Sequence, residues 1–286
     1  MHRPHNGLRT AALLGLLCAV LLLAGRALAG TTGLLVALVV ALGVNGYCYL
    51  CSDRLALRSM RAYPVSQVQQ PQLYAVVAEL AAAMRLPMPR LYLSPTAAPN
   101  AFATGRDPRH AAVCCTEGIL ALLDERELRG VLGHELAHVG NRDILLSSVA
   151  GALAAVIMVL AQVAAVAGGL SREEDREGGL VGTLLLAVLG PLAATLVQLA
   201  VSRDREYRAD ATGARVTGDP LALAAALRKL DAGTREWPLV EDARLVATSA
   251  LMIANPFAGG IGRLLRTHPP MAERVARLEA LAGYRR

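Results

Sequence analysis

The chain has 286 residues, of which 54% are hydrophobic and only 3% aromatic, and its formal net charge is +6. This length accommodates one or two domains. The apolar residues are mostly Ala, Leu, Val and Gly, a composition more typical of packed membrane helices than of a water-soluble core. The basic balance does not point to nucleic acid, because no Lys/Arg patch is interleaved with aromatic residues. The five scattered cysteines exclude a disulfide framework.

Apolar stretches divide the chain, and each approaches or exceeds the length that crosses a bilayer as a helix. They cover about residues 10–25, 31–51, 144–170 and 178–202. The alternative for each stretch is a buried core helix. For the first, a signal peptide is a further alternative, because a basic segment precedes it and residues 27–29 (ALA) resemble a cleavage site. A second apolar run follows at once, which favours a retained helical hairpin.

The distribution of arginines predicts how the chain is placed in the membrane. Arginines precede the first stretch and follow the second and the fourth, whereas the connection at 171–177 is mainly acidic. Because positive residues are retained on the cytoplasmic side, the termini and residues 52–143 are expected in the cytoplasm. Four parts follow: a membrane hairpin (1–51), a catalytic part (52–143), a second hairpin (144–202) and a carboxy-terminal catalytic part (203–286).

The first catalytic part is predicted to combine helices with a small sheet. Asp124 and Glu127 have the spacing of a helix-capping box at the start of the second helix. Helices are expected over 69–86 and 124–140, with strands at 90–95, 101–105 and 110–116. The predicted fold class is therefore mainly α with a small β-sheet (α+β), in a membrane-embedded protein with four transmembrane helices.

The helix expected over 124–140 contains the motif H-E-x-x-H. His134 and His138 lie one turn apart on one face, so their imidazoles can ligate a single metal ion. Glu135 is rotated off that stripe, toward a metal-bound water whose proton it can accept. The alternative is an ordinary helix with two histidines, but burying these polar residues in an apolar turn is costly. The motif predicts a catalytic zinc site with Glu135 as the general base.

A catalytic zinc site needs a third protein ligand and an open coordination position. The segment SRDREYRADATGA, after the fourth apolar stretch, places Glu206 and Asp210 one helical turn apart. Glu206 is predicted to be the third ligand, and Asp210 to accept a hydrogen bond from a ligating imidazole. Taken alone, the segment also fits a charged helix face just outside the membrane, with its acids and arginines paired.

Three segments carry a resemblance to a known family: HELAHVGNRD, SRDREYRADATGA and THPPMAERVARL. In this order they resemble the HtpX-type membrane zinc metalloproteases, which are relatives of the CAAX prenyl proteases. The resemblance covers nearly the whole chain. It implies a gluzincin fold with zinc held by His134, His138 and Glu206, and with Glu135 as the base. It also implies endoproteolysis at the cytoplasmic face of the bacterial inner membrane, in quality control of membrane and misfolded proteins and in stress response.

The segment PNAFATG has two interpretations. In the first, Asn100, Ala101 and Phe102 belong to an edge strand near the cleft that binds an extended substrate by strand addition. In the second, they form an ordinary strand of the sheet. Asn141 and Asp143, just past the H-E-x-x-H motif, are interpreted as residues that cap or end the helix.

His268 also has two interpretations. The resemblance implies that it stabilises the oxyanion of the transition state as a hydrogen-bond donor. Alternatively, the segment is simply a helix start, with Pro269 or Pro270 in the first turn.

The sequence predicts an integral-membrane zinc endopeptidase whose partners are the lipid bilayer and protein substrates, without nucleic acid. Two alternatives stay open. The first is a non-catalytic membrane scaffold that keeps a structural zinc, for which a fourth protein ligand is expected because structural sites are closed. The second is a CAAX-type protease acting on prenylated peptides, which needs a larger intramembrane chamber than four spans form.

Overall fold

A computed structural model describes most of the chain outside the predicted second hairpin. It describes residues 5–153, 202–240, 245, 248–249, 251–257 and 269–283. Residues 154–201, which make up most of the predicted spans at 144–170 and 178–202, therefore lie outside the described residues. The start of the first of these spans belongs to the short apolar helix Asp143–Leu153.

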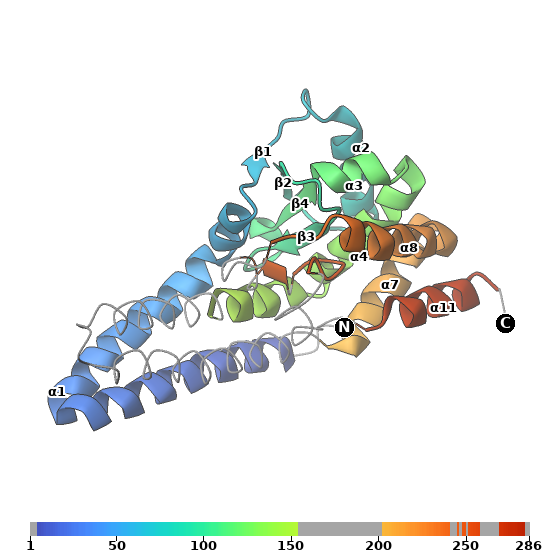
Figure 1. Cartoon of the computed structure of the whole chain (residues 1–286). Helices are drawn as coiled ribbons and strands as arrows, with labels where there is room; N and C mark the ends of the chain where they lie inside the picture. Colours follow the sequence, from blue (N-terminus) through green and yellow to red (C-terminus); the bar gives the residue numbers. More distant parts are fainter. Residues whose placement is uncertain are drawn as a thin grey trace, which may run out of the picture.

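The chain begins with a helical hairpin, α1 (His5–Ser59), which extends away from the remainder (Figure 1). The helix is interrupted at Ala29 and Gly30, and Gly30 has a φ of 57°, which costs little without a Cβ atom. Hydrogen bonds connect the two arms of the hairpin, which lie before and after this interruption. Asn45 Nδ2 of the second arm donates to Leu14 O (3.3 Å) and Cys18 Sγ (2.8 Å) of the first. Within the described residues, Ala29–Ser59 is the one helix long and apolar enough to cross a membrane, so the four predicted transmembrane helices are not all established.

A four-stranded mixed sheet follows α1, with the strand order β1-β2-β4-β3. Only the β2–β4 pair is parallel. The strands are β1 (Tyr63–Pro64), β2 (Arg90–Ser94), β3 (Ala101–Thr104) and β4 (Ala112–Thr116). Every residue of β3 and β4 is buried, so both faces of the sheet are covered there. Three strands match the predicted ones except at their ends, whereas β1 is too short to leave a pattern in the sequence.

Helices pack around this sheet (Figure 1). The first, α2 (Pro71–Ala83), has proline in its first turn and buries an apolar stripe with helical spacing. The other helical elements are η1 (Pro108–His110), α3 (Glu117–Leu122), α4 (Glu125–Gly140), α7 (Arg203–Thr217), α8 (Pro220–Glu236) and α11 (Met271–Leu281). The fold is therefore mainly helical with a small sheet, as predicted.

Helix α4 lies at the centre of the fold and packs against β3, α2, α7 and α8. Its start is fixed by the predicted capping box. Asp124 Oδ1 accepts from Glu127 N (2.9 Å), and Glu127 Oε2 accepts from Asp124 N (3.0 Å). One hydrophobic core includes Leu91 of β2, Leu132 of α4 and Leu227 of α8. The two predicted catalytic parts, which are separated in sequence by residues 144–202, thus share a single core.

The contact between α4 and α7 is close enough to exclude side chains. A Cβ atom placed on Gly213 of α7 would lie 2.8 Å from the backbone nitrogen of His134 and 3.0 Å from the carbonyl carbon of Gly133. Because both neighbours are backbone atoms, a larger residue at 213 must push the helices apart, and overpacking of this kind costs about 1–3 kcal/mol. This contact holds the polar face of α7 against the H-E-x-x-H turn of α4.

Candidate active site

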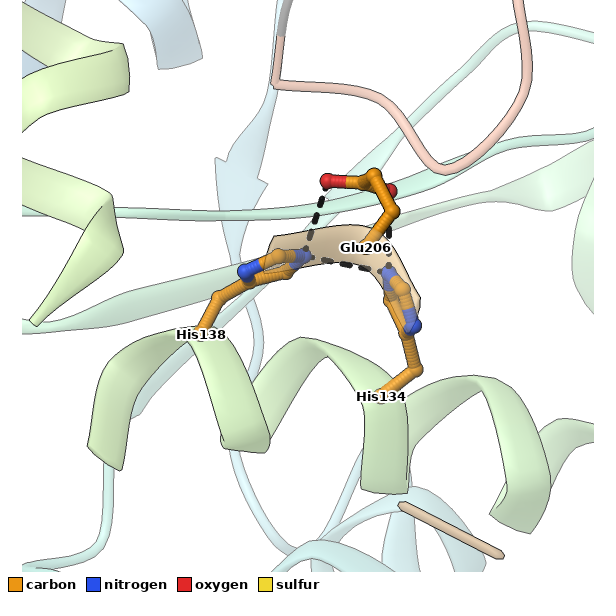
Figure 2. Close-up of side chains that lie close together, drawn as sticks. All are labelled: His134, His138 and Glu206. Atoms are coloured by element: carbon orange, nitrogen blue, oxygen red, sulfur yellow. Dashed lines mark hydrogen bonds and ion pairs between the residues drawn. The ribbon is translucent and has the colours of Figure 1, made fainter. Parts of the chain in front are cut away.

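His134 and His138 of α4 and Glu206 of α7 turn their polar atoms toward one another (Figure 2). The two Nε2 atoms are 3.1 Å apart, and the Glu206 carboxylate lies 3.7 Å from His134 Nε2 and 3.5 Å from His138 Nε2. Zinc bonds of about 2.0–2.1 Å in a tetrahedral arrangement place neighbouring ligand atoms about 3.3–3.4 Å apart. The three predicted ligands therefore fit one zinc-sized cation.

Two carboxylates orient the imidazoles. Asp210 Oδ1 lies 2.8 Å from Nδ1 of His134, and Asp143 Oδ2 lies 3.2 Å from Nδ1 of His138. A carboxylate at Nδ1 keeps the proton there and leaves Nε2 as the coordinating atom. The sequence predicts this contact for Asp210, but it assigns Asp143 only to the helix end, and the contact with His138 is new.

The two histidines have opposite electrostatic environments. Burial lowers the pKa of His134 to about 4 even though Asp210 favours the charged form. Burial also disfavours charge on His138, but the Glu206 carboxylate and the hydrogen bond that Nδ1 donates to Asp143 outweigh it and raise the pKa to about 9. The carboxylates of Glu206 and Asp143 thus favour a positive charge at the His138 ring. Either a proton on the ring or a metal ion bound to it can supply that charge.

Glu135 is buried beside this cluster, with its two carboxylate oxygens in different environments. Oε2 accepts a hydrogen bond from the Ala103 amide of β3 (2.8 Å), while Oε1 has no hydrogen-bond partner among the described residues. Burial raises the pKa of Glu135 to about 8, and repulsion from Glu206 adds to the rise. A buried carboxylate with one oxygen unpaired among the described residues, next to three candidate metal ligands, has the environment of a general base.

Arg274 of α11 is a site residue that the sequence analysis does not identify. It is fully buried. Its Nε and Nη2 donate to the two oxygens of Asp210 at 2.8 and 2.7 Å, and Nη2 lies 3.3 Å from His134 Nδ1. A third bond runs from Nη1 to the carbonyl of Ile253 (3.0 Å). Burial disfavours the charged form of Asp210, but Arg274 outweighs it and holds the pKa of that carboxyl well below its usual range.

The sequence contains a signal for this arginine. Arg274 lies on the buried face of α11 together with Val275 and Leu278. An arginine on the apolar stripe of an amphipathic helix is costly to bury unless an acid compensates it. Its position within THPPMAERVARL therefore indicates a buried acidic partner, although the sequence alone does not say which one.

The three residues predicted to bind substrate, Asn100, Ala101 and Phe102, are all fully buried at the start of β3. The outer edge of this strand is already paired with the segment 251–257. Asn100 Nδ2 donates to Ala254 O (2.8 Å), Ala101 O accepts from Ile253 N (3.1 Å), and Phe102 forms an antiparallel bridge with the same segment. Their role in binding substrate stays a prediction.

His268 lies outside the described residues, and its role at the oxyanion also stays a prediction. The helix start expected at this place is confirmed, since α11 begins at Met271. Pro270 is its N-cap residue, so both prolines precede the first turn in which one of them was expected.

Sequence comparisons relate this chain to known metalloproteases. Residues 67–282 match peptidase family M48. The chain is 60% identical to a protease HtpX homolog of Kineococcus radiotolerans, with 100% of both chains covered, and 57% identical to one of Arthrobacter sp. (strain FB24), with 99% of both covered.

Its fold resembles the crystal structure of S. mikatae Ste24p, with a TM-score of 0.52 at 17% identity. That match covers 96% of this chain and 65% of the Ste24p chain, so the two share a fold while Ste24p is the longer protein. Given the family match over most of the sequence and the full-length relatives, the chain belongs to peptidase family M48 and is an HtpX-type metalloprotease.

Proposed function

We propose that this metalloprotease is an integral-membrane, zinc-dependent endopeptidase that cleaves membrane and misfolded proteins at the cytoplasmic face of the bacterial inner membrane, in quality control. One observation supports the catalytic part above the others. Glu135 Oε1 is buried beside three converging ligand atoms, and no residue in the described part of the chain forms a hydrogen bond with it. A merely structural metal site has no need for such a carboxylate.

His134, His138 and Glu206 would hold the zinc ion, which when bound polarises the scissile carbonyl and acidifies a water molecule. Glu135 accepts a proton from that water at Oε1 and donates it to the nitrogen of the leaving amine. The Ala103 amide holds the other oxygen of Glu135 in place during this transfer. Because the site is buried, these charges act at low dielectric, where each interaction is stronger than in water.

Arg274 acts through Asp210 and not on the substrate. Its two hydrogen bonds fix the carboxylate, which in turn fixes the ring of His134. The guanidinium also neutralises a charge that would otherwise lie buried and unpaired. We therefore assign Arg274 as a positioning residue for the first zinc ligand.

Substrate binding is proposed along β3, at Asn100, Ala101 and Phe102. An extended peptide that pairs with this edge must replace the hydrogen bond between Ile253 and Ala101. His268 is proposed as a donor to the oxyanion. It precedes α11, the helix that already reaches the site through Arg274.

The proposed membrane placement has four spans, with the catalytic parts in the cytoplasm. The arm Ala29–Ser59 supports one span by its length and composition. The arginine-rich segments after the second and fourth apolar stretches support the orientation.

Glu206→Gln should remove the anionic zinc ligand. Wild-type protein is expected to hold about one zinc ion per chain, and this variant much less. Since a proton competes for His138 below its pKa of about 9, wild-type zinc affinity should fall by up to about tenfold per pH unit as the pH is lowered. In the variant this dependence should be shallower, because Glu206 is the main group that raises the pKa of His138.

Metal analysis measures the zinc content of wild type and Glu206→Gln, and competitive chelator titration between pH 6 and 9 measures how their zinc affinity depends on pH. Glu125→Gln, at an exposed position of α4, is the control, and full zinc content in Glu206→Gln would exclude it as a ligand.

Arg274→Gln should leave Asp210 buried without its counter-charge. Zinc affinity is expected to fall about 10–100-fold, as when other groups that orient a metal ligand are removed. Stability should fall by about 3–5 kcal/mol, because breaking a buried ion pair strands one charge. Arg274→Lys should recover part of the zinc affinity, because it restores the charge but not the paired hydrogen bonds. The exposed Arg277→Gln on the same helix is the control, and unchanged zinc affinity in Arg274→Gln would contradict the positioning role.

Glu135→Gln keeps the size of the side chain but removes its ability to accept a proton. Zinc content and thermal stability should remain near wild type, while cleavage of an unfolded protein substrate should fall by at least about 10²-fold. Glu125→Gln again serves as the control. A non-catalytic scaffold predicts no difference between the three proteins, and loss of zinc from Glu135→Gln would show that its role has been misassigned.

The membrane placement predicts where reporter fusions become active. Fusions after residue 60 and at the carboxy terminus should report the cytoplasm, and fusions within 171–177 the opposite side. A cytoplasmic signal from 171–177 would rule out the four-span arrangement.

A further inference from the structure

A basic pocket lies where α1 leaves its apolar arm and meets the sheet. Its volume is about 340 Å³, and three separate parts of the chain line it: the end of α1, the start of β2, and the segment from Arg106 to His110, which includes η1. Its principal side chains are Tyr49, Leu50, Arg54, Arg90, Arg106 and Arg109. None of these residues takes part in the active site.

The pocket has more positive than negative charge. Four arginines line it, together with one acid, Asp53, which pairs with Arg90 (2.8 Å). The acid nearest to Arg106 is Asp107, at 3.7 Å, and its carboxylate also bonds the ring of His110. Arg54 and Arg109 have no ion pair with any described residue. Two guanidinium groups from different segments thus line the same hollow, and in the part of the chain that the structure describes neither has an acidic partner.

The pocket also lies at a particular depth along the proposed span. On the same arm of α1, the large apolar side chains from Leu35 to Leu42 are exposed, with Val39 at 71%. Tyr47, Tyr49 and Leu50 follow, at 47%, 41% and 55% exposed. Tyrosines mark the boundary between hydrocarbon and head groups in membrane proteins. If this arm spans the bilayer, the arginines that come next lie at the level of the lipid phosphates.

We propose that this pocket binds the phosphate group of an anionic phospholipid. Guanidinium groups form paired, charge-assisted hydrogen bonds with phosphate oxygens, and basic pockets at the cytoplasmic side of spans suit anionic head groups. The proposal rests on α1 crossing the membrane, which is part of the proposed function, but it does not depend on proteolysis.

A lipid held here would connect the bilayer to the catalytic fold. Arg90 begins β2, and η1 follows β3, the strand whose Ala103 amide holds Glu135. The bound head group would therefore fix the height and tilt of the sheet, and with it the active site, relative to the membrane surface.

The test uses the purified full chain in neutral detergent, with short-chain phosphatidylglycerol or phosphatidylcholine added and binding counted by native mass spectrometry. Arg54→Gln/Arg109→Gln should bind phosphatidylglycerol about 25-fold more weakly than wild type, which corresponds to about fivefold for each charge removed. Arg85→Gln/Arg215→Gln removes the same charge from exposed positions elsewhere and should bind within about twofold of wild type. Arg54→Lys/Arg109→Lys keeps the charges and should retain most of the binding.

Equal binding of phosphatidylglycerol by wild type and Arg54→Gln/Arg109→Gln would overturn the site. Equal binding of phosphatidylcholine and phosphatidylglycerol by wild type would do the same. If inorganic phosphate displaces the lipid at equal concentration, the pocket is a site for free phosphate and the lipid proposal is wrong. The zinc content of each variant reports whether it is folded. If Arg54→Gln/Arg109→Gln loses zinc, the single variant Arg109→Gln replaces it, and its affinity for phosphatidylglycerol should be about fivefold lower than that of wild type. A negative lipid result with full zinc content and cleavage would leave the protease proposal intact.

Discussion

The close backbone contact between α4 and α7 is the constraint on which the active site depends. Gly213 lies against the backbone at Gly133 and His134, so no side chain separates the two helices at that level. The contact brings Glu206 and Asp210 to the histidines of α4, although the predicted second membrane hairpin separates the two segments in sequence. The hydrophobic core that residues before and after this hairpin share then holds the arrangement in place. A metal site assembled from two helices in this way needs little reorganisation when the ion binds.

Charge balance is the second constraint. Glu135, Asp143, Glu206 and Asp210 are all buried within the same region, and buried carboxylates are stable only when paired or neutralised. Arg274 neutralises Asp210, and it does so while holding the carboxylate toward His134. Glu206 lies 3.9 Å from Arg274 and also raises the pKa of His138 to about 9. Part of its counter-charge is therefore a proton on His138, which a metal ion can replace. The fixed cation, Arg274, stabilises the fold, whereas the exchangeable proton marks the position proposed for the metal ion.

Much of this could be predicted from the sequence because local spacing determines it. The capping box at Asp124 and the i, i+4 pairs on α4 and α7 depend only on helical periodicity. The predicted sheet strands are also local patterns of apolar residues. Arg274 and Asp143 could not be paired with their partners in advance, because those contacts depend on how α11 and the end of α4 pack. The pairing of Ala101 with Ile253 is likewise a tertiary contact, and it bears on how a substrate reaches β3. The strand β1 is two residues long and has no sequence signal of its own.

The central claim is that a zinc ion held by His134, His138 and Glu206 is required for cleavage of peptide bonds. The most direct measurement is cleavage of one unfolded protein by the purified wild-type chain in detergent. The cleavage rate is measured three times: before chelation, after chelation with metal loss verified by elemental analysis, and after one equivalent of zinc is restored. The account predicts that cleavage disappears with the metal and returns with zinc, while the protein remains folded throughout. Undiminished cleavage by a protein shown to contain no metal would contradict it.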